Sequence, residues 1–210
     1  MELEDRILHT IFSVLFLLFL FERGYFQAKA MRVSGEARKI RESKRKLTTT
    51  ILLFLIAQLW VIGSFIYLIK PAILEWTRLP IPSWIRWLGM IITVLGMVLE
   101  FSTQLYLGRN YSTTLHIREG QSLVTSGPYR YIRHPMYTAL ITVGVGIGLL
   151  SSSWYFLLPF IATGIVIAFR TRREEEAMIE KFGDEYIQYA QGTGRFFPQI
   201  RKKQNGNEEV

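Results

Sequence analysis

Five long apolar runs constrain the fold of this chain more than any other feature of its sequence. They cover residues 7–26, 51–69, 84–107, 135–150 and 154–169 of a 210-residue chain in which 50% of the residues are hydrophobic. A helix needs about 20 apolar residues to cross the hydrocarbon core of a bilayer. A soluble domain of this length has no core large enough for so many such runs. We therefore expect an all-α, polytopic membrane protein with about five transmembrane helices.

The last two apolar runs predict a tight helical hairpin. Only Ser151, Ser152 and Ser153 separate them. At about 1.5 Å per residue, each run reaches about 24 Å, which barely crosses the hydrocarbon core. We therefore expect the three serines to form the tip of the hairpin.

Apolar and aromatic side chains continue at helical spacing beyond the fifth run. Those that recur among charged neighbours are Met178, Phe182, Tyr186 and Tyr189. This pattern is typical of an amphipathic helix at a membrane surface. We expect Gly183 to end this helix and Asp184 to be the N-cap of the next one. A disordered tail is expected over residues 201–210.

The distribution of basic residues predicts the orientation of the helices. Lys and Arg are concentrated in residues 23–46, whereas the next loop carries only Lys70, Arg78 and Arg86. By the positive-inside rule, the first of these loops lies in the cytosol, and residues 108–134 and the C-terminal helical segment lie on the same side. The net charge of +8 is thus distributed by loop. We expect the lipid bilayer as a partner and no nucleic acid.

A polar motif, Arg133-His134-Pro135-Met136-Tyr137, stands where the fourth run begins. Proline lacks an N–H and fits the first turn of a helix, so His134 is expected just ahead of a helix start. The free N–H groups of that turn favour a bound anion. The alternative is that His134 and Tyr137 are only interfacial anchors of the membrane segment.

A second polar motif follows the fifth run. Arg170 and Glu174 are four residues apart and share one face of a continuous helix, whereas Glu175 and Glu176 turn to other faces. A guanidinium can hold a carboxylate in two parallel hydrogen bonds, and a Glu can accept one from an ammonium group. The alternative is an intrahelical ion pair beside a solvated acidic run. Adjacent helical positions diverge, and the chain has no cysteine, so we expect no metal site.

The run from Gly144 to Gly148 looks like a glycine-rich nucleotide loop. A dinucleotide-binding loop needs a preceding strand and an acidic residue about 20 positions on, whereas this run lies within an apolar helix. Gly144 and Gly148 instead form a small-residue face, as do Gly164 and Ala168 on the returning helix. We therefore expect them to pack the hairpin.

Glu100 is a carboxylate inside an apolar run, where an ionisable group is costly unless it is protonated, paired or in contact with water. It is a candidate functional residue, and Gln104, four residues on, is expected on the same helical face. The alternative is a structural hydrogen bond between helices.

Four ordered motifs resemble the isoprenylcysteine carboxyl methyltransferase family of integral membrane enzymes. They are residues 123–129, residues 133–137, Arg170 with residues 174–176, and residues 182–186. The resemblance covers residues 108–198. It implies S-adenosylmethionine as methyl donor, a donor pocket on the cytosolic side, and an acceptor that enters from the bilayer. The acceptor would be a prenylated or other amphipathic carboxylate.

The resemblance also implies roles for individual residues. Arg170 would bind the substrate carboxylate and, with Glu174, would be catalytic. The cofactor would be held by His116, Gln121, Ser122, Leu123, Val124, Tyr129, His134, Pro135, Tyr137 and Glu174. This chain departs from the family in having Arg172 and Arg173 before the glutamates. The choice of Glu174 over Glu175 rests on its offset from Arg170.

The expected organisation is a single membrane domain over residues 1–210. Three N-terminal transmembrane helices occupy residues 1–107, and a cofactor-binding catalytic part occupies residues 108–200. Two other functions compete with carboxyl methylation: N-methylation of a phospholipid or other lipid amine, and a non-catalytic membrane scaffold of the same fold. A nicotinamide-dependent reductase fits less well because the chain is short. The sequence indicates neither the physiological substrate nor the oligomeric state.

Overall fold

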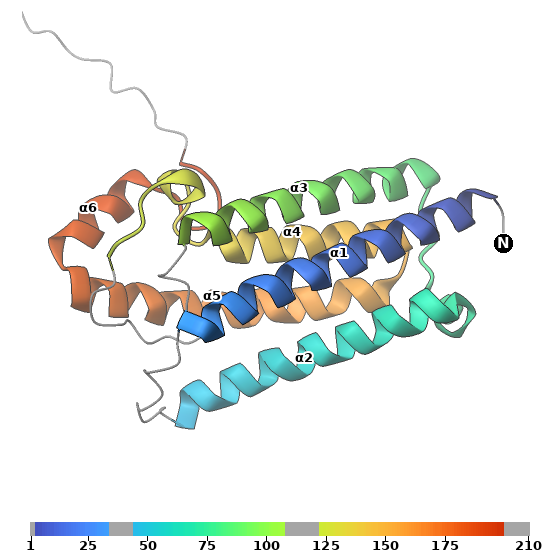
Figure 1. The fold of residues 1–210 in the computed structure, drawn as a ribbon, viewed down its shortest axis with the longest axis horizontal. Coiled ribbons are helices and arrows are strands. Elements are labelled where there is room, and N and C mark those ends of the chain that lie inside the picture. Colours follow the sequence, from blue (N-terminus) through green and yellow to red (C-terminus); the bar gives the residue numbers. More distant parts are fainter. Residues whose placement is uncertain (1–2, 34–43, 108–121, 200–210) are drawn as a thin grey trace, which may run out of the picture.

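The computed structural model describes residues 3–33, 44–107 and 122–199. These ranges are almost entirely helical and contain no strand, which confirms the predicted all-α class. The elements are α1 (Leu3–Val33), α2 (Lys44–Ile69), η1 (Pro71–Thr77), α3 (Ser83–Leu107), η3 (Gly127–Arg130), α4 (Pro135–Ser151), α5 (Trp154–Phe182) and α6 (Asp184–Gly192). The long helices run along a common direction, and α6 lies at the end of the bundle away from the N-terminus (Figure 1).

The membrane character of the chain is evident in the helices themselves. Among the described residues, Leu3–Lys29, Ile51–Ile69, Ser83–Leu107 and Trp154–Phe182 are long and apolar enough to cross a membrane, and Pro135–Ser151 is a shorter apolar helix. Large apolar side chains on α2, such as Phe54, Leu59 and Ile62, are exposed. Lipid is the solvent that suits such a surface. The chain is an integral membrane protein, as predicted.

The hairpin between α4 and α5 has the predicted serine tip. Ser152 adopts a left-handed conformation, with φ of 55°, and its N–H donates to the carbonyl of Leu149 at 3.1 Å. The tip is buried against the loop that precedes α3, where Ser152 Oγ donates to the Leu79 carbonyl at 2.7 Å and Ser153 Oγ lies 2.6 Å from Thr77 Oγ1. These partners satisfy hydroxyl groups that would otherwise be buried without hydrogen bonds.

The predicted N-cap of α6 is wrong by one residue. Gly183, with φ of 53°, is both the C-cap of α5 and the N-cap of α6, and Asp184 is the first helical residue of α6. Glycine adopts this backbone conformation without the steric cost that a side chain would add. Asp184 still lies in the first turn of α6, where the helix dipole stabilises a carboxylate.

Glycines bring the backbones of α3 and α4 into close contact. A Cβ built at Gly89 would lie 2.5 Å from the Leu150 nitrogen, and one at Gly96 would lie 2.8 Å from the Val143 nitrogen. On α4, a Cβ at Gly144 would meet the Phe160 ring of α5. The predicted packing of the hairpin is therefore confirmed at Gly144 but is wrong at Gly164, where an added Cβ would meet only Ile141 Cδ1, at 3.8 Å. The closer backbone approach, between α3 and α4, was not predicted.

Substitution of Gly96 by alanine should destabilise the folded protein by about 1–3 kcal/mol, because backbone atoms of α4 cannot move aside for the methyl group. Gly164→Ala is the matched control, since the nearest atom to its added Cβ, Ile141 Cδ1, is 3.8 Å away. Both changes gain the same helix propensity. Thermal unfolding of the two variants in one detergent measures the difference. Equal midpoints would contradict this packing.

Candidate functional site

The predicted site residues line one cavity at the end of the bundle where α6 lies. Its volume is about 740 Å³. Helices α1, α2, α4, α5 and α6 and the segment leading into η3 all contribute to its lining. The predicted residues found there are Ser122, Leu123, Val124, Tyr129, His134, Pro135, Tyr137, Arg170 and Glu174. His116 and Gln121 lie outside the described residues.

Pro135 positions His134 as the sequence predicts. It is the first residue of α4, and His134 is the N-cap. The His134 carbonyl accepts hydrogen bonds from the N–H groups of Tyr137 and Thr138, each at 3.2 Å. Its imidazole and the Tyr137 ring are stacked, with centroids 5.9 Å apart. The start of α4 thus presents two polar aromatic groups to the cavity.

Glu174 is the centre of the polar part of the cavity. Its Oε1 accepts hydrogen bonds from Tyr137 Oη at 2.7 Å and from Arg170 Nε at 2.8 Å. His134 Nδ1 lies 3.7 Å from its Oε2. The Arg170 and Glu174 side chains are 13% and 19% exposed. The intrahelical ion pair, which the sequence analysis named as the alternative to a substrate-binding role, therefore forms, and it lies in the cavity wall rather than on a solvated surface.

Glu175 faces a different set of partners. Its Oε1 accepts from Arg133 Nε at 3.1 Å and lies 3.2 Å from His134 Nε2. Arg195 also binds it, through Nε at 3.1 Å and through Nη2. The hydrogen bond to Glu175 raises the pKa of the Arg195 guanidinium. Glu174 thus lies in the cavity lining, whereas Glu175 belongs to an ion-pair network beside the cavity.

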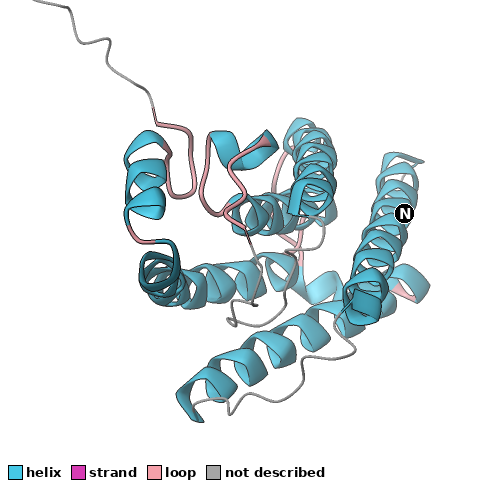
Figure 2. Cartoon of the chain, turned by 60° about the vertical axis from the view of Figure 1, so that its left-hand side comes forward, coloured by secondary structure: helices cyan, strands magenta, loops and turns pink. Residues whose placement is uncertain are grey.

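This network fastens the segment after α6 to the segment before α4. The N–H groups of Arg133 and His134 donate to the carbonyls of Gly194 and Arg195, at 2.8 and 3.0 Å. Arg133 Nη1 donates to the carbonyls of Ala190, at 2.7 Å, and Thr193. The segment between η3 and α4 lies beside the segment after α6, where Ile132 and Gly194 form a parallel bridge (Figure 2). The same contacts hold α6 against the cavity.

Sequence reasoning assigned no site role to the two tyrosines of α6, although their helical spacing identified the helix. Tyr186 and Tyr189 line the cavity. Tyr189 Oη donates to the Tyr129 carbonyl at 2.7 Å, and burial raises the pKa of Tyr189 to about 12. The phenol is therefore a neutral hydrogen-bond donor near pH 7.

Among the described residues, no cluster of His, Asp or Glu has the arrangement of a metal site.

Most of the remaining lining is apolar. It includes Phe19 and Leu20 of α1, Phe54 and Trp60 of α2, and Phe160 and Ile167 of α5. One cavity therefore combines ion pairs at its polar end with a hydrocarbon-like wall. Such a cavity fits a ligand that is itself part polar and part lipid.

We predict that Glu175→Ala loosens the segment after α6 and leaves the bundle folded. Arg133, His134 and Arg195 would lose a shared charged partner, at a local cost of about 2 kcal/mol. Amide hydrogen exchange over residues 186–196 should accelerate, about 30-fold at this cost. Glu176→Ala, which removes an exposed carboxylate from the next position, is the control. Unchanged exchange in Glu175→Ala would show that the network does not hold the segment.

Comparisons with known proteins point to membrane methyltransferases. Residues 84–185 match the family model described as phospholipid methyltransferase. The chain is 30% identical over 111 residues to protein-S-isoprenylcysteine O-methyltransferase B of Arabidopsis thaliana, covering 51% of this chain and 56% of the relative. It is 27% identical over 130 residues to the Homo sapiens protein-S-isoprenylcysteine O-methyltransferase, covering 60% and 45%. The chain thus spans about half the length of these relatives.

A solved structure shares the fold. The eukaryotic intramembrane Ras methyltransferase, an isoprenylcysteine carboxyl methyltransferase, aligns with a TM-score of 0.52 and 20% identity. The alignment covers 86% of this chain and 63% of that one. The similarity in fold therefore extends well beyond the motifs from which the resemblance was first inferred.

Proposed function

We propose that this chain is a member of the isoprenylcysteine carboxyl methyltransferase family, which its similarity to these relatives supports, and that it transfers a methyl group to the carboxylate of a lipid-like acceptor. The donor is S-adenosylmethionine, and the products are a methyl ester and S-adenosylhomocysteine. The acceptor class is a prenylcysteine or another amphipathic acid. The positive-inside distribution of Lys and Arg favours a cavity that opens to the cytosol.

The observation that carries this proposal is the joining of two environments in one cavity. Arg170, Glu174 and Tyr137 form hydrogen-bonded contacts at its polar end, and Phe160 and Trp60 lie in its apolar wall. An acidic lipid needs both, because its head group must meet a cation while its tail stays out of water.

The residues at the polar end fit a cationic methyl donor. Glu174 supplies a carboxylate for the ammonium group of such a molecule, and Tyr129, Tyr186 and Tyr189 supply aromatic surface and hydroxyl groups. When bound, the donor supplies an electrophilic methyl group on a sulfonium. We assign the amino-acid part of the donor to Glu174 and His134, and we assign the acceptor carboxylate to Arg170.

In this reaction the protein only has to align the two reactants and exclude water from them. An oxygen of the acceptor carboxylate attacks the methyl carbon, a C–O bond forms, the C–S bond breaks, and its electron pair stays on sulfur. The acceptor is already ionised, so no general base is required. Arg170 orients the carboxylate, and the apolar wall keeps water away from the reacting atoms, which must approach to about 3–3.5 Å.

Arg170→Ala should lower the turnover number by about 100- to 1000-fold, the loss that follows removal of one well-placed charge-stabilising group. The measurement is transfer of labelled methyl from the donor to a prenylcysteine in detergent or vesicles. Arg172→Ala removes an exposed arginine two residues away and serves as the control. Undiminished transfer by folded Arg170→Ala would refute the assignment.

Glu174→Gln should instead weaken donor binding, about tenfold or more, because a charge-assisted hydrogen bond becomes a neutral one. Isothermal titration with S-adenosylhomocysteine in detergent measures this, with Glu176→Gln as control. If the Glu174 variant still bound S-adenosylhomocysteine tightly, the assignment of Glu174 to the donor site would be wrong. An unaltered protein that binds no S-adenosylhomocysteine would favour the non-catalytic scaffold.

The second candidate function is N-methylation of a lipid amine. The matching family model, described as phospholipid methyltransferase, favours it. The two activities are separated by the product, since a carboxyl methyl ester releases its label in base and a methylated amine does not. Phosphatidylethanolamine and prenylcysteine are therefore offered in parallel. Base-stable label on phosphatidylethanolamine alone would replace carboxyl methylation with amine methylation.

A further inference from the structure

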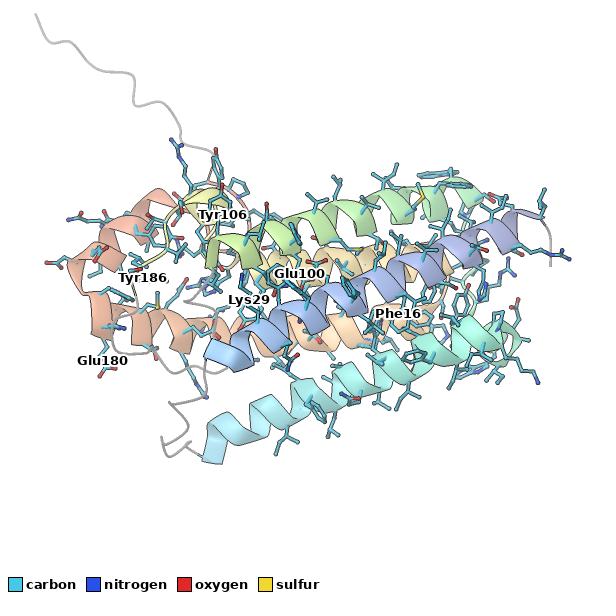
Figure 3. The ribbon with its side chains drawn as sticks, viewed as in Figure 1. Phe16, Lys29, Glu100, Tyr106, Glu180 and Tyr186 are labelled. Carbon is cyan, nitrogen blue, oxygen red and sulfur yellow. The ribbon has the colours of Figure 1, made fainter. Side chains whose placement is uncertain are left out.

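A buried polar cluster joins α1 to α3 beside the cavity. Glu100 of α3, labelled in Figure 3, is fully buried, and its Oε1 lies 2.8 Å from Arg23 Nη1 of α1. Gln104 Nε2, from the next turn of α3, donates to the same oxygen at 3.3 Å. Glu100 is thus paired across two helices, which answers the question of how the apolar run accommodates its charge.

The two partners of this ion pair differ in their exposure. Glu100 is fully buried, whereas the Arg23 side chain is 33% exposed and lines the cavity. Glu100 Oε2 and Gln104 Oε1 are buried and have no hydrogen-bond partner among the described residues. A pair that only fastened two helices would be expected to satisfy its buried oxygens. The arrangement instead buries the anion behind the wall and leaves the cation at the cavity surface.

Further contacts fix Arg23 in that position. Its guanidinium lies 5.8 Å from the centroid of the Phe19 ring, one helical turn earlier on α1. Phe19, Arg23 and Gln27 are spaced four residues apart, so they share the face of α1 that lines the cavity. Next to the pair, the rings of Phe26 and Phe101 meet edge to face, with centroids 5.6 Å apart. The cation is therefore held in place before any ligand arrives.

The catalytic scheme leaves Arg23 without a role. The acceptor carboxylate is assigned to Arg170 of α5, and α1 lies outside residues 84–185, which match the family model. Arg23 instead lines the same cavity as Leu20 of α1 and Phe54 and Trp60 of α2. Glu100 engages Nη1 of the guanidinium, so the other N–H groups can donate to the head group of an acidic lipid, and such hydrogen bonds are stronger beside hydrocarbon-like walls than in water.

We propose that Arg23, fixed by Glu100, is a second anion-binding subsite of the cavity. It receives the carboxylate of a single-chain amphipathic acid as the molecule enters along α1 and α2, before the head group passes on to Arg170. The choice of a carboxylate rests on the proposed function. Arg23 is thus a positioning residue that selects acidic acceptors and takes no part in methyl transfer.

Binding without any methyl donor tests this subsite directly. A fluorescent long-chain carboxylate and its methyl ester serve as probes, and the protein is kept intact in detergent. Arg23→Gln should weaken binding of the carboxylate about tenfold, the effect of losing one charge-assisted hydrogen bond. Binding of the ester should not change. Arg23→Lys should recover part of the loss because it keeps the charge.

Two further variants control for charge and for the anchor. Lys29→Gln removes an exposed positive charge from the same end of α1 and should leave both probes bound as before. Glu100→Gln should change the affinity for the carboxylate and leave that for the ester unaltered, since Glu100 both orients the guanidinium and offsets its charge. Equal loss of both probes in Arg23→Gln would mean a structural role and would overturn the subsite.

Steady-state methyl transfer separates this subsite from the catalytic assignment. Arg23→Gln should raise KM for the acceptor about tenfold with kcat nearly unchanged, whereas Arg170→Ala lowers kcat. If kcat falls and KM does not, the subsite is refuted. A long-chain alkyl phosphate identifies the anion: weakened binding of the phosphate with unaltered binding of the carboxylate would also overturn the proposal. Absence of methyl transfer would refute the proposed function and leave the probe-binding result standing.

Discussion

The continuity of α5 through the boundary between its apolar and charged parts is the constraint on which the site depends. The helix runs unbroken from Trp154 to Phe182, so the apolar turns that pack against α4 also set the direction of the charged turns that follow. Arg170 and Glu174 can share a cavity wall only because no break separates them. Gly183, which has positive φ, ends the helix after both have been placed.

The same helical geometry gives two adjacent carboxylates different partners. Successive residues of an α-helix are rotated by about 100°, so Glu174 and Glu175 face different partners, and only His134 lies near both, through its two ring nitrogens. Glu174 meets Tyr137 and Arg170 in the cavity, while Glu175 meets Arg133 and Arg195 behind it. Glu175 helps to hold the segment after α6, and Glu174 is left to line the cavity.

Apolar length and helix-end chemistry made much of the fold predictable from the sequence. The five apolar runs, the serine tip and the start of α4 at Pro135 all depend on residues close together in the chain. The shared face of Arg170 and Glu174 is local in the same sense. The residue assignment at Asp184 failed because Gly183 could occupy both cap positions at once.

What could not be predicted depends on pairings between distant parts of the chain. Nothing local to Glu100 shows that Arg23 is its partner, and nothing local to Gly96 shows that the α4 backbone approaches it. Likewise, the role of Arg195 follows only from the course of the chain after α6, which brings it back to Glu175. Helical periodicity gives the face on which a side chain lies, but not the helix that it faces.

The wall contributed by α1 and α2 changes how the N-terminal helices are understood. From the sequence they are membrane segments without a motif, and the polar motifs lie after them. In the structure, Phe19 and Arg23 of α1 and Trp60 of α2 line the same cavity as Arg170. Helices that were needed only for anchoring could face lipid on every side, yet Arg23 points inward with a buried carboxylate behind it. A charge within an apolar helix is costly unless it is paired, and the ion pair with Glu100 is what allows a guanidinium to stand in this wall.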